Sequence, residues 1–139
     1  MRLFLDTNVL LDIVLERQGH VESQAVVQAV IHGHEFFIAW HSLGTIFYVA
    51  RKSKGKAAAM KFLNETVAWA TVASVRHKDA LHSLALSFTD YEDAMQAVAA
   101  EACAADLIIT RNLVDFKTSS VPAMAPEEFL TTYHPKPAP

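Results

Sequence analysis

The first twelve residues, MRLFLDTNVLLD (1–12), place a short apolar run directly in front of a helical pattern. Residues 3–5 are continuously apolar, as in a strand that is buried on both faces. Residues 7–8 make a favourable helix start, and apolar side chains then recur at helical spacing through 9–14. A strand that leads straight into a helix is the repeating unit of an α/β fold with a parallel sheet.

The rest of the chain continues this alternation of strands and helices. Hairpin signals are almost absent, so we predict an α/β/α sandwich with a parallel sheet of about four or five strands. Residues 1–133 are expected to form one domain, followed by a disordered proline-rich tail at 134–139. Further strands are expected at 36–39, 71–73, 107–109 and 121–124, and further helices at 21–31, 42–52, 57–68, 78–88, 90–104 and from Pro126.

Size and composition limit the functional classes. The chain has 139 residues, 52% hydrophobic and 19% charged, which is typical of one compact domain with a substantial core. The net charge of −3 gives no global support for nucleic-acid binding, so any such surface must be local. A single cysteine excludes an internal disulfide framework and favours the cytoplasm. Asp6 and Asp12 interrupt the apolar start, which therefore fits neither a signal peptide nor a membrane-spanning helix.

Three aspartates stand where apolar strands end or where a helix begins. Asp6 follows the first strand, Asp115 lies in the turn after the strand at 107–109, and Asp93 lies in the first turn of the helix before that strand. The carboxyl ends of parallel strands meet at one edge of a sheet, where sites form. Three carboxylates would repel one another there unless a cation such as Mg²⁺ or Mn²⁺ neutralised them. The pattern therefore predicts metal-assisted phosphodiester chemistry.

Three segments carry a resemblance to a known family. They are LDTNVLLD (5–12), DYEDAMQAVAA (90–100) and IITRNLVDF (108–116), and their order, spacing and strand context agree with that family. Together they resemble the PIN-domain family, including the VapC-like toxins of toxin–antitoxin pairs. The resemblance implies a PIN-like sandwich that acts as a Mg²⁺- or Mn²⁺-dependent endoribonuclease on RNA. It also implies an antitoxin protein as partner and a homodimeric assembly, with no membrane.

The resemblance assigns roles to individual residues. Asp6, Asp93 and Asp115 match the family's catalytic metal ligands. Supporting polar positions, which would hold the carboxylates or metal-bound water by hydrogen bonds, fall on Asn8, Thr110 and Asn112.

One position departs from the family pattern. The family usually carries a glutamate on the helix after the second strand, and the segment SLGTIFYVARK (42–52) puts Thr45 there. A threonine can hold a water but brings no negative charge, so metal affinity should fall. Asp90 and Glu92 are candidates for the missing carboxylate, and Asp90, one helical turn before Asp93, is the better placed. Thr45 is therefore expected to support the site, with Asp90 as a conditional fourth metal ligand.

Each acidic residue also has a purely structural interpretation. Asp6 suits a helix N-terminus, and Asp115 suits a turn. Asp90 and Asp93 fit an N-cap and its partner in a variant of the capping box. The coincidence of all of them within one three-segment pattern favours the site.

Basic residues indicate where RNA phosphates would bind. Arg111, next to the expected site, is the favoured phosphate contact, and pairing with Asp115 is its alternative. A second cluster holds five of the 12 basic residues, and solvated helix faces explain it better than an RNA-binding track. The five are Arg51, Lys52, Lys54, Lys56 and Lys61.

Histidine, cysteine and aromatic residues are assigned mainly to packing. His32, His34 and His41 lack the paired spacing of a zinc site, so structural or surface roles are favoured. Cys103 lies on an apolar helix and is expected in the core. Core or dimer contacts are likewise favoured over base stacking for Trp40, Phe47 and Tyr48.

Two functions of different class remain open. The metal-dependent endoribonuclease is favoured, and a catalytically silent PIN-like module that binds RNA or a protein is the alternative supported by Thr45. A phosphoacceptor domain would need a lysine near the site, for which Lys117 is a poor fit. A haloacid-dehalogenase-like phosphatase would need an aspartate at the position of Asn8.

Overall fold

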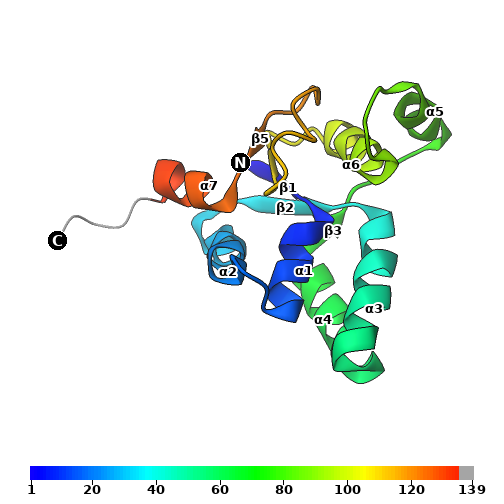
Figure 1. The fold of residues 1–139 in the computed structure, drawn as a ribbon. Coiled ribbons are helices and arrows are strands. Elements are labelled where there is room, and N and C mark those ends of the chain that lie inside the picture. The colour runs from blue at the N-terminus through cyan, green and yellow to red at the C-terminus, as the bar shows by residue number, and fades with distance from the viewer. Residues whose placement is uncertain (135–139) are drawn as a thin grey trace.

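The computed structural model describes residues 1–134, apart from the side chains of residues 30 and 31. The tail expected at 134–139 therefore lies, beyond His134, outside the described residues. One wholly parallel sheet runs through the centre (Figure 1), which confirms the predicted sheet. Its strands, in spatial order, are β3 (Ala70–Val72), β2 (Glu35–Ile38), β1 (Arg2–Leu5), β4 (Leu107–Ile109) and β5 (Ala123–Met124).

Helices cover both faces of the sheet (Figure 1). On one face lie α1 (Thr7–Leu15), α2 (His20–Gln28) with the 3₁₀ turn η1 (Ala29–His32), α3 (Trp40–Lys54), α4 (Lys56–Trp69) and α7 (Pro126–Tyr133). On the other lies α6 (Tyr91–Ala102), with α5 (His77–Ala85) packed against it. The two layers of helices around one sheet confirm the α/β/α sandwich.

The core explains why the strands are continuously apolar. Leu3 and Leu5 of β1 join the cluster under the five-helix layer, whereas Phe4 joins the cluster under α6. All three side chains are fully buried, because successive residues of a strand point to opposite faces. Cys103 is also buried in the α6 layer, as predicted.

Local signals set several helix starts. Asp6 is the N-cap of α1, and its Oδ1 accepts a hydrogen bond from the backbone N–H of Asn8 at 3.2 Å. Asp90 is the N-cap of α6. Pro126 occupies the first turn of α7, where its missing N–H costs nothing.

Four elements are shorter than expected, and one of them, α6, spans Tyr91–Ala102 where 90–104 was predicted. Helix α2 ends at Gln28 and continues only as the 3₁₀ turn η1, and α5 ends at Ala85 because Leu86 adopts extended backbone. Strand β5 begins at Ala123, since Pro122 accepts a bond from the Ile108 N–H but has no N–H to return.

The aromatic residues of α3 do not all pack inward. The buried face of α3 carries Ser42, Ile46 and Ala50, at a spacing of four residues. Trp40 and Tyr48 lie off that face and are 70% and 61% exposed, so the core alternative is wrong for these two residues and a dimer contact stays a prediction. None of the helices in residues 1–134 combines the length and apolar character that a membrane span requires.

Candidate active site

The carboxyl edge of the sheet brings the ends of β1 and β4 together. The backbone N–H of Asp6 donates to the carbonyl of Ile109 at 3.0 Å, which continues the pairing of the two strands by one residue. Thr110, next along the chain, donates its hydroxyl to Asp6 Oδ2 at 2.7 Å. Both side chains are fully buried. Thr110 therefore supports the Asp6 carboxylate directly, in the way predicted for a neighbouring polar residue.

Gln96 is a site residue that the sequence reasoning missed. Its Nε2 donates to Asp6 Oδ1 at 3.0 Å, and its Oε1 accepts the backbone N–H of Thr7 at 2.9 Å. The Thr7 hydroxyl in turn lies 2.7 Å from that of Ser42. These buried contacts connect α6, α1 and α3 around Asp6. A signal did exist: Gln96 is a polar residue within an alanine-rich helix, one turn after Asp93.

Asp93 lies on α6 with only 8% of its surface exposed. Burial and, second, the nearby carboxylates raise the pKa of Asp93 to about 7. In order of effect these carboxylates are Asp6, Asp90, Asp115 and Glu92. Within residues 1–134, no lysine or arginine forms an ion pair with any of them. The edge thus carries negative charge that the described chain does not neutralise.

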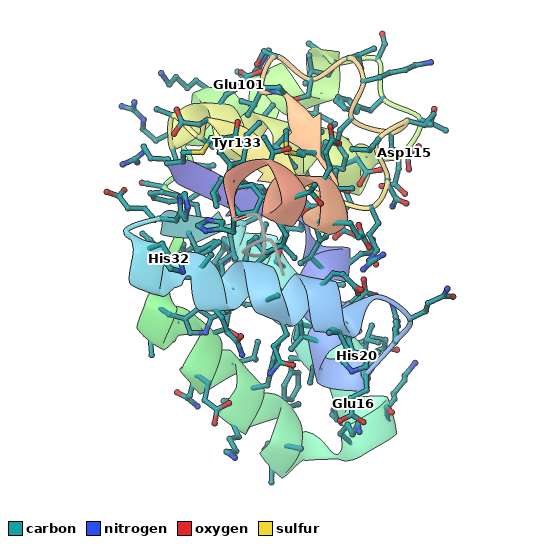
Figure 2. All side chains as sticks on the ribbon, turned by 90° about the vertical axis from the view of Figure 1, so that its left-hand side faces the viewer. Glu16, His20, His32, Glu101, Asp115 and Tyr133 are labelled. Atoms are coloured by element: carbon teal, nitrogen blue, oxygen red, sulfur yellow. The ribbon has the colours of Figure 1, made fainter. Side chains whose placement is uncertain are left out.

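Asp90 and Asp115 reach this edge from less buried positions. Asp90 Oδ1 accepts the backbone N–H groups of Glu92 at 2.8 Å and Asp93 at 3.4 Å, so its capping role is real. Asp115 is exposed in the turn after β4 and projects from the surface in Figure 2. Its N–H donates to the carbonyl of Asn112 at 3.1 Å, as the turn interpretation expects. Asp90 therefore caps a helix and Asp115 stabilises a turn, and both still lie close enough to Asp93 to raise its pKa.

The two asparagines expected to support the carboxylates act through their backbones. The Asn8 N–H donates to Asp6, as described for the start of α1. The Asn112 N–H donates to Thr110 Oγ1 at 3.0 Å, which links the turn carrying Asp115 to the residue that holds Asp6.

Oxygen donors and unneutralised charge suit a hard divalent cation at this edge. Carboxylates are the ligands that Mg²⁺ and Mn²⁺ prefer, and such a cation would offset the repulsion that raises the pKa of Asp93. Over the part of the chain that is described, no three acidic, histidine or cysteine side chains form a ready-made metal-binding group. The fit of a divalent cation to this edge therefore rests on the oxygen atoms available as ligands and on their negative charge.

Thr45 adds no charge to the edge. Its hydroxyl donates to the carbonyl of His41, one turn earlier on α3, at 3.3 Å. Glu92, one of the two candidates to replace a family glutamate, has its Oε1 3.7 Å from Nε2 of His41. Asp90 caps α6, and within residues 1–134 neither Asp90 nor Glu92 forms a hydrogen bond with Thr45.

Arg111 is tied to the protein through three of its nitrogens. Nε donates to Asp12 Oδ2 at 2.9 Å, Nη1 to Glu127 Oε1 at 3.0 Å and Nη2 to the carbonyl of Gly19 at 2.6 Å. Pairing with Asp115, the alternative weighed for this residue, is therefore wrong. Phosphate binding by Arg111 stays a prediction, and it would require the guanidinium to give up one of these contacts.

The five-residue basic cluster lies at the far end of α3 and the start of α4, and all its members are exposed. Lys54 lies 3.8 Å from Glu16, and Lys61 lies 3.5 Å from Glu65. This agrees with the solvated-face interpretation. The cluster is separated from the carboxylates, because α3 begins beside Ser42 and ends at Lys54.

His32, His34 and His134 lie together at the opposite, amino-terminal edge of the sheet, whereas His41 lies on α3 near Glu92. His34 directly precedes β2, and its Nε2 lies 2.9 Å from Nε2 of His134, which the sequence reasoning did not connect to it. The His32 ring lies 4.8 Å from that of His134. Figure 2 shows His32 and Asp115 on opposite sides of the molecule. These histidines therefore have the structural role predicted and do not complete the acidic edge.

Comparison with known proteins gives one family and several structural matches. The PIN-domain family model matches residues 2–114. A structure of VapBC2 from Rickettsia felis, bound to a DNA fragment from their promoter, has a chain that matches with a TM-score of 0.69 and 18% identity, covering 90% of this chain and 98% of that one. Comparison with curated protein sequences gives no match.

Two further structures have the same fold. A VapBC-1 chain from nontypeable Haemophilus influenzae has a TM-score of 0.69 and 14% identity, with 91% of this chain and 99% of that one covered. A chain of DNA-bound VapBC from Salmonella typhimurium has a TM-score of 0.67 and 17% identity, with 91% and 98% covered.

Proposed function

The chain belongs to the PIN-domain family, and from that premise we propose that it is a Mg²⁺- or Mn²⁺-dependent endoribonuclease that hydrolyses RNA phosphodiester bonds. The observation that carries the proposal is the buried Asp93 carboxyl, whose pKa is raised to about 7 among unneutralised acids. Such an arrangement lowers the stability of the fold, and locally unfavourable arrangements of this kind are typical of functional sites.

Each part of the edge has a role in this proposal. Asp6, Asp93 and Asp115 would hold the cation, with Asp90 as a conditional fourth ligand. The cation would supply charge neutralisation for the phosphate and a more acidic water. Thr110 and Gln96 hold both oxygens of Asp6 by hydrogen bonds, which fixes the direction of that carboxylate.

The biological setting follows from the same resemblance. The structural matches are VapBC complexes, and three sequence segments resemble VapC-like toxins. We therefore assign this chain to the toxin half of a toxin–antitoxin pair, acting in the cytoplasm as a homodimer with an antitoxin protein as partner.

A second function is favoured by one specific contact. The Thr45 hydroxyl bonds to its own helix and brings no charge where the family usually has a glutamate. A catalytically silent PIN-like module that binds RNA or a protein would tolerate that change.

Cleavage of a mixed RNA pool with Mn²⁺, Mg²⁺ or EDTA separates the two functions. We expect metal-dependent cleavage by the wild type and none by Asp6→Asn. Glu65→Gln, an acid-to-amide change on the exposed side of α4, is the matched control and should cleave normally. Absence of cleavage together with no rise in melting temperature on addition of Mn²⁺ would support the silent module instead.

A further inference from the structure

A cavity of about 130 Å³ lies between α5, α6 and the start of α3, outside the acidic edge. Its floor is apolar and includes Met95 and the buried Ala99. Two exposed aromatic side chains, Trp40 and Tyr91, stand in its wall. The cavity is therefore an apolar recess flanked by flat aromatic surfaces.

One polar atom in the wall lacks a partner. Nε2 of His41 is shielded from solvent and has no hydrogen bond among the described residues. The oxygen of Glu92 at 3.7 Å is beyond hydrogen-bond distance. By contrast, the hydroxyls of Ser83 and Tyr91 satisfy each other at 3.0 Å. Because this nitrogen is shielded from solvent, an occupant of the cavity reaches it only after the His41 ring turns, and a donor or acceptor on the occupant would then satisfy it.

A basic group stands at the same recess. Arg76 lines the cavity, and its guanidinium makes no ion pair within residues 1–134. Asp79, the acid in the wall, already accepts the backbone N–H of Arg76 at 2.7 Å. The exposed guanidinium is thus available to an anionic group attached to the occupant of the cavity.

We propose that this cavity binds the pyrimidine base of an RNA nucleotide that flanks the cleaved bond. The proposal rests on the ribonuclease function for its ligand. A cavity of about 150 Å³ binds one benzene, and this recess of about 130 Å³ is closer in size to one six-membered ring than to the two fused rings of a purine. Trp40 and Tyr91 offer stacking surfaces and Arg76 meets a phosphate, while a turn of the His41 ring would bring Nε2 to the polar edge of the base.

The cavity and the acidic edge share two elements. Helix α6 carries Asp93 and Gln96 on one side and Tyr91 and Met95 on the other. The helix is about 10 Å across, so a strand of RNA that crosses its first turn can reach both places. At the second element, His41 immediately precedes Ser42, whose hydroxyl belongs to the network around Asp6.

Nucleotide binding without metal tests the cavity by itself. In EDTA, we expect UMP and CMP to quench the fluorescence of Trp40 saturably and more strongly than AMP and GMP do. Ala80→Phe, which fills the cavity from an exposed position on α5, should weaken UMP binding tenfold or more. Ala85→Phe makes the same change at an exposed position of α5 outside the lining and should bind UMP as the wild type does.

Cleavage of RNA pools then separates this proposal from the ribonuclease function. Ala80→Phe should still cleave with Mn²⁺ but lose the preference for a pyrimidine beside the cut. Equal UMP binding by wild type and Ala80→Phe would overturn the proposal, even with cleavage intact. A shift in the monomer–dimer equilibrium of Ala80→Phe without UMP binding would overturn it too, and would assign the cavity to contact between two copies. UMP binding without any cleavage would support the base site while overturning the ribonuclease.

Discussion

The carboxyl group of Asp93 lies almost fully buried among acids, where burial first and nearby carboxylates second raise its pKa from 3.8 to about 7. Between these two values the folded protein holds a proton that the unfolded chain has lost. The stability that this proton contributes is complete below about pH 4 and is lost as the pH rises to about 7. In the absence of metal, an ionised Asp93 therefore destabilises the fold.

Asp93→Asn should remove that penalty. In EDTA at about pH 8, we expect the free energy of unfolding to rise by about 1 kcal/mol or more, since one pKa unit corresponds to about 1.4 kcal/mol. Urea unfolding measures this change, and the wild type should lose more stability than the variant between about pH 5 and 8. The same variant should show no stabilisation by Mn²⁺ and no cleavage. A variant less stable than the wild type at high pH would contradict the argument.

Whereas an ionised Asp93 destabilises the fold, Gln96 stabilises it, and Gln96 also holds Asp6 in the site. Gln96→Met keeps a similar length but removes one partner of Asp6 Oδ1 and the partner of the Thr7 N–H. The Thr7 N–H is then unsatisfied and Asp6 Oδ1 keeps only the Asn8 N–H, so we expect a loss of about 1–3 kcal/mol in the free energy of unfolding. Cleavage should fall as well, because Asp6 loses its direction. Gln24→Met, at an exposed position of α2, is the control and should change neither quantity.

At the scale of elements, interactions near in sequence were predictable and distant ones were not. Every residue of the apolar runs 3–5 and 107–109 is buried. Asp90 caps a helix that starts at the next residue. The contacts of Gln96 and Arg111, in contrast, join residues about ninety or a hundred positions apart. Periodicity marks such residues as polar but does not identify their partners.

A contact between His34, just before β2, and His134, just after α7, shows most clearly that partners distant in the sequence were not predictable. Nε2 of His34 and Nε2 of His134 lie 2.9 Å apart, so one nitrogen must carry a hydrogen and the other must not. Burial lowers the pKa of His34, and the N-terminal amine, His134 and His32 lower it further. The folded protein therefore favours the neutral form of His34.

This arrangement predicts a loss of stability in mild acid. Below about pH 6.5 the unfolded chain takes up a proton at His34 that the folded chain resists, so the contribution to stability is complete above that pH and is lost as the pH falls. His34→Gln should show a smaller fall in the free energy of unfolding between about pH 7.5 and 5.5. His77→Gln, at an exposed position that begins α5, should fall as the wild type does. Identical pH profiles for all three proteins would count against the interpretation. The contribution of His34 to stability is lost as the pH falls, whereas that of Asp93 is lost as the pH rises. His34→Gln and Asp93→Asn therefore separate the two effects.

At the scale of the whole molecule, the acidic edge and the basic cluster lie at opposite ends of α3. Helix α3 has 15 residues and spans about 22 Å between its start beside the acidic edge and the basic cluster at its end. The net charge is −3, and within the described chain Asp6, Asp90, Asp93 and Asp115 form no ion pair with a lysine or arginine. Under the proposed function, bound cations would attract an RNA phosphate to the acidic edge, and metal affinity would then limit cleavage.

Thr45→Glu tests that limit directly. It adds a carboxylate at the position where the family resemblance implies one, while Thr45 itself contributes only a hydroxyl bonded to its own helix. We expect Mn²⁺ to bind about tenfold more tightly, equivalent to about 1.4 kcal/mol, and cleavage at low Mn²⁺ to increase. Without metal the variant should melt at a lower temperature than the wild type, because one more acid joins the unneutralised edge. Tyr48→Glu adds the same charge at an exposed position of α3 and should leave Mn²⁺ affinity unchanged. Equal Mn²⁺ affinity in wild type and Thr45→Glu would mean that the edge already has its full set of ligands, with Asp90 as the fourth.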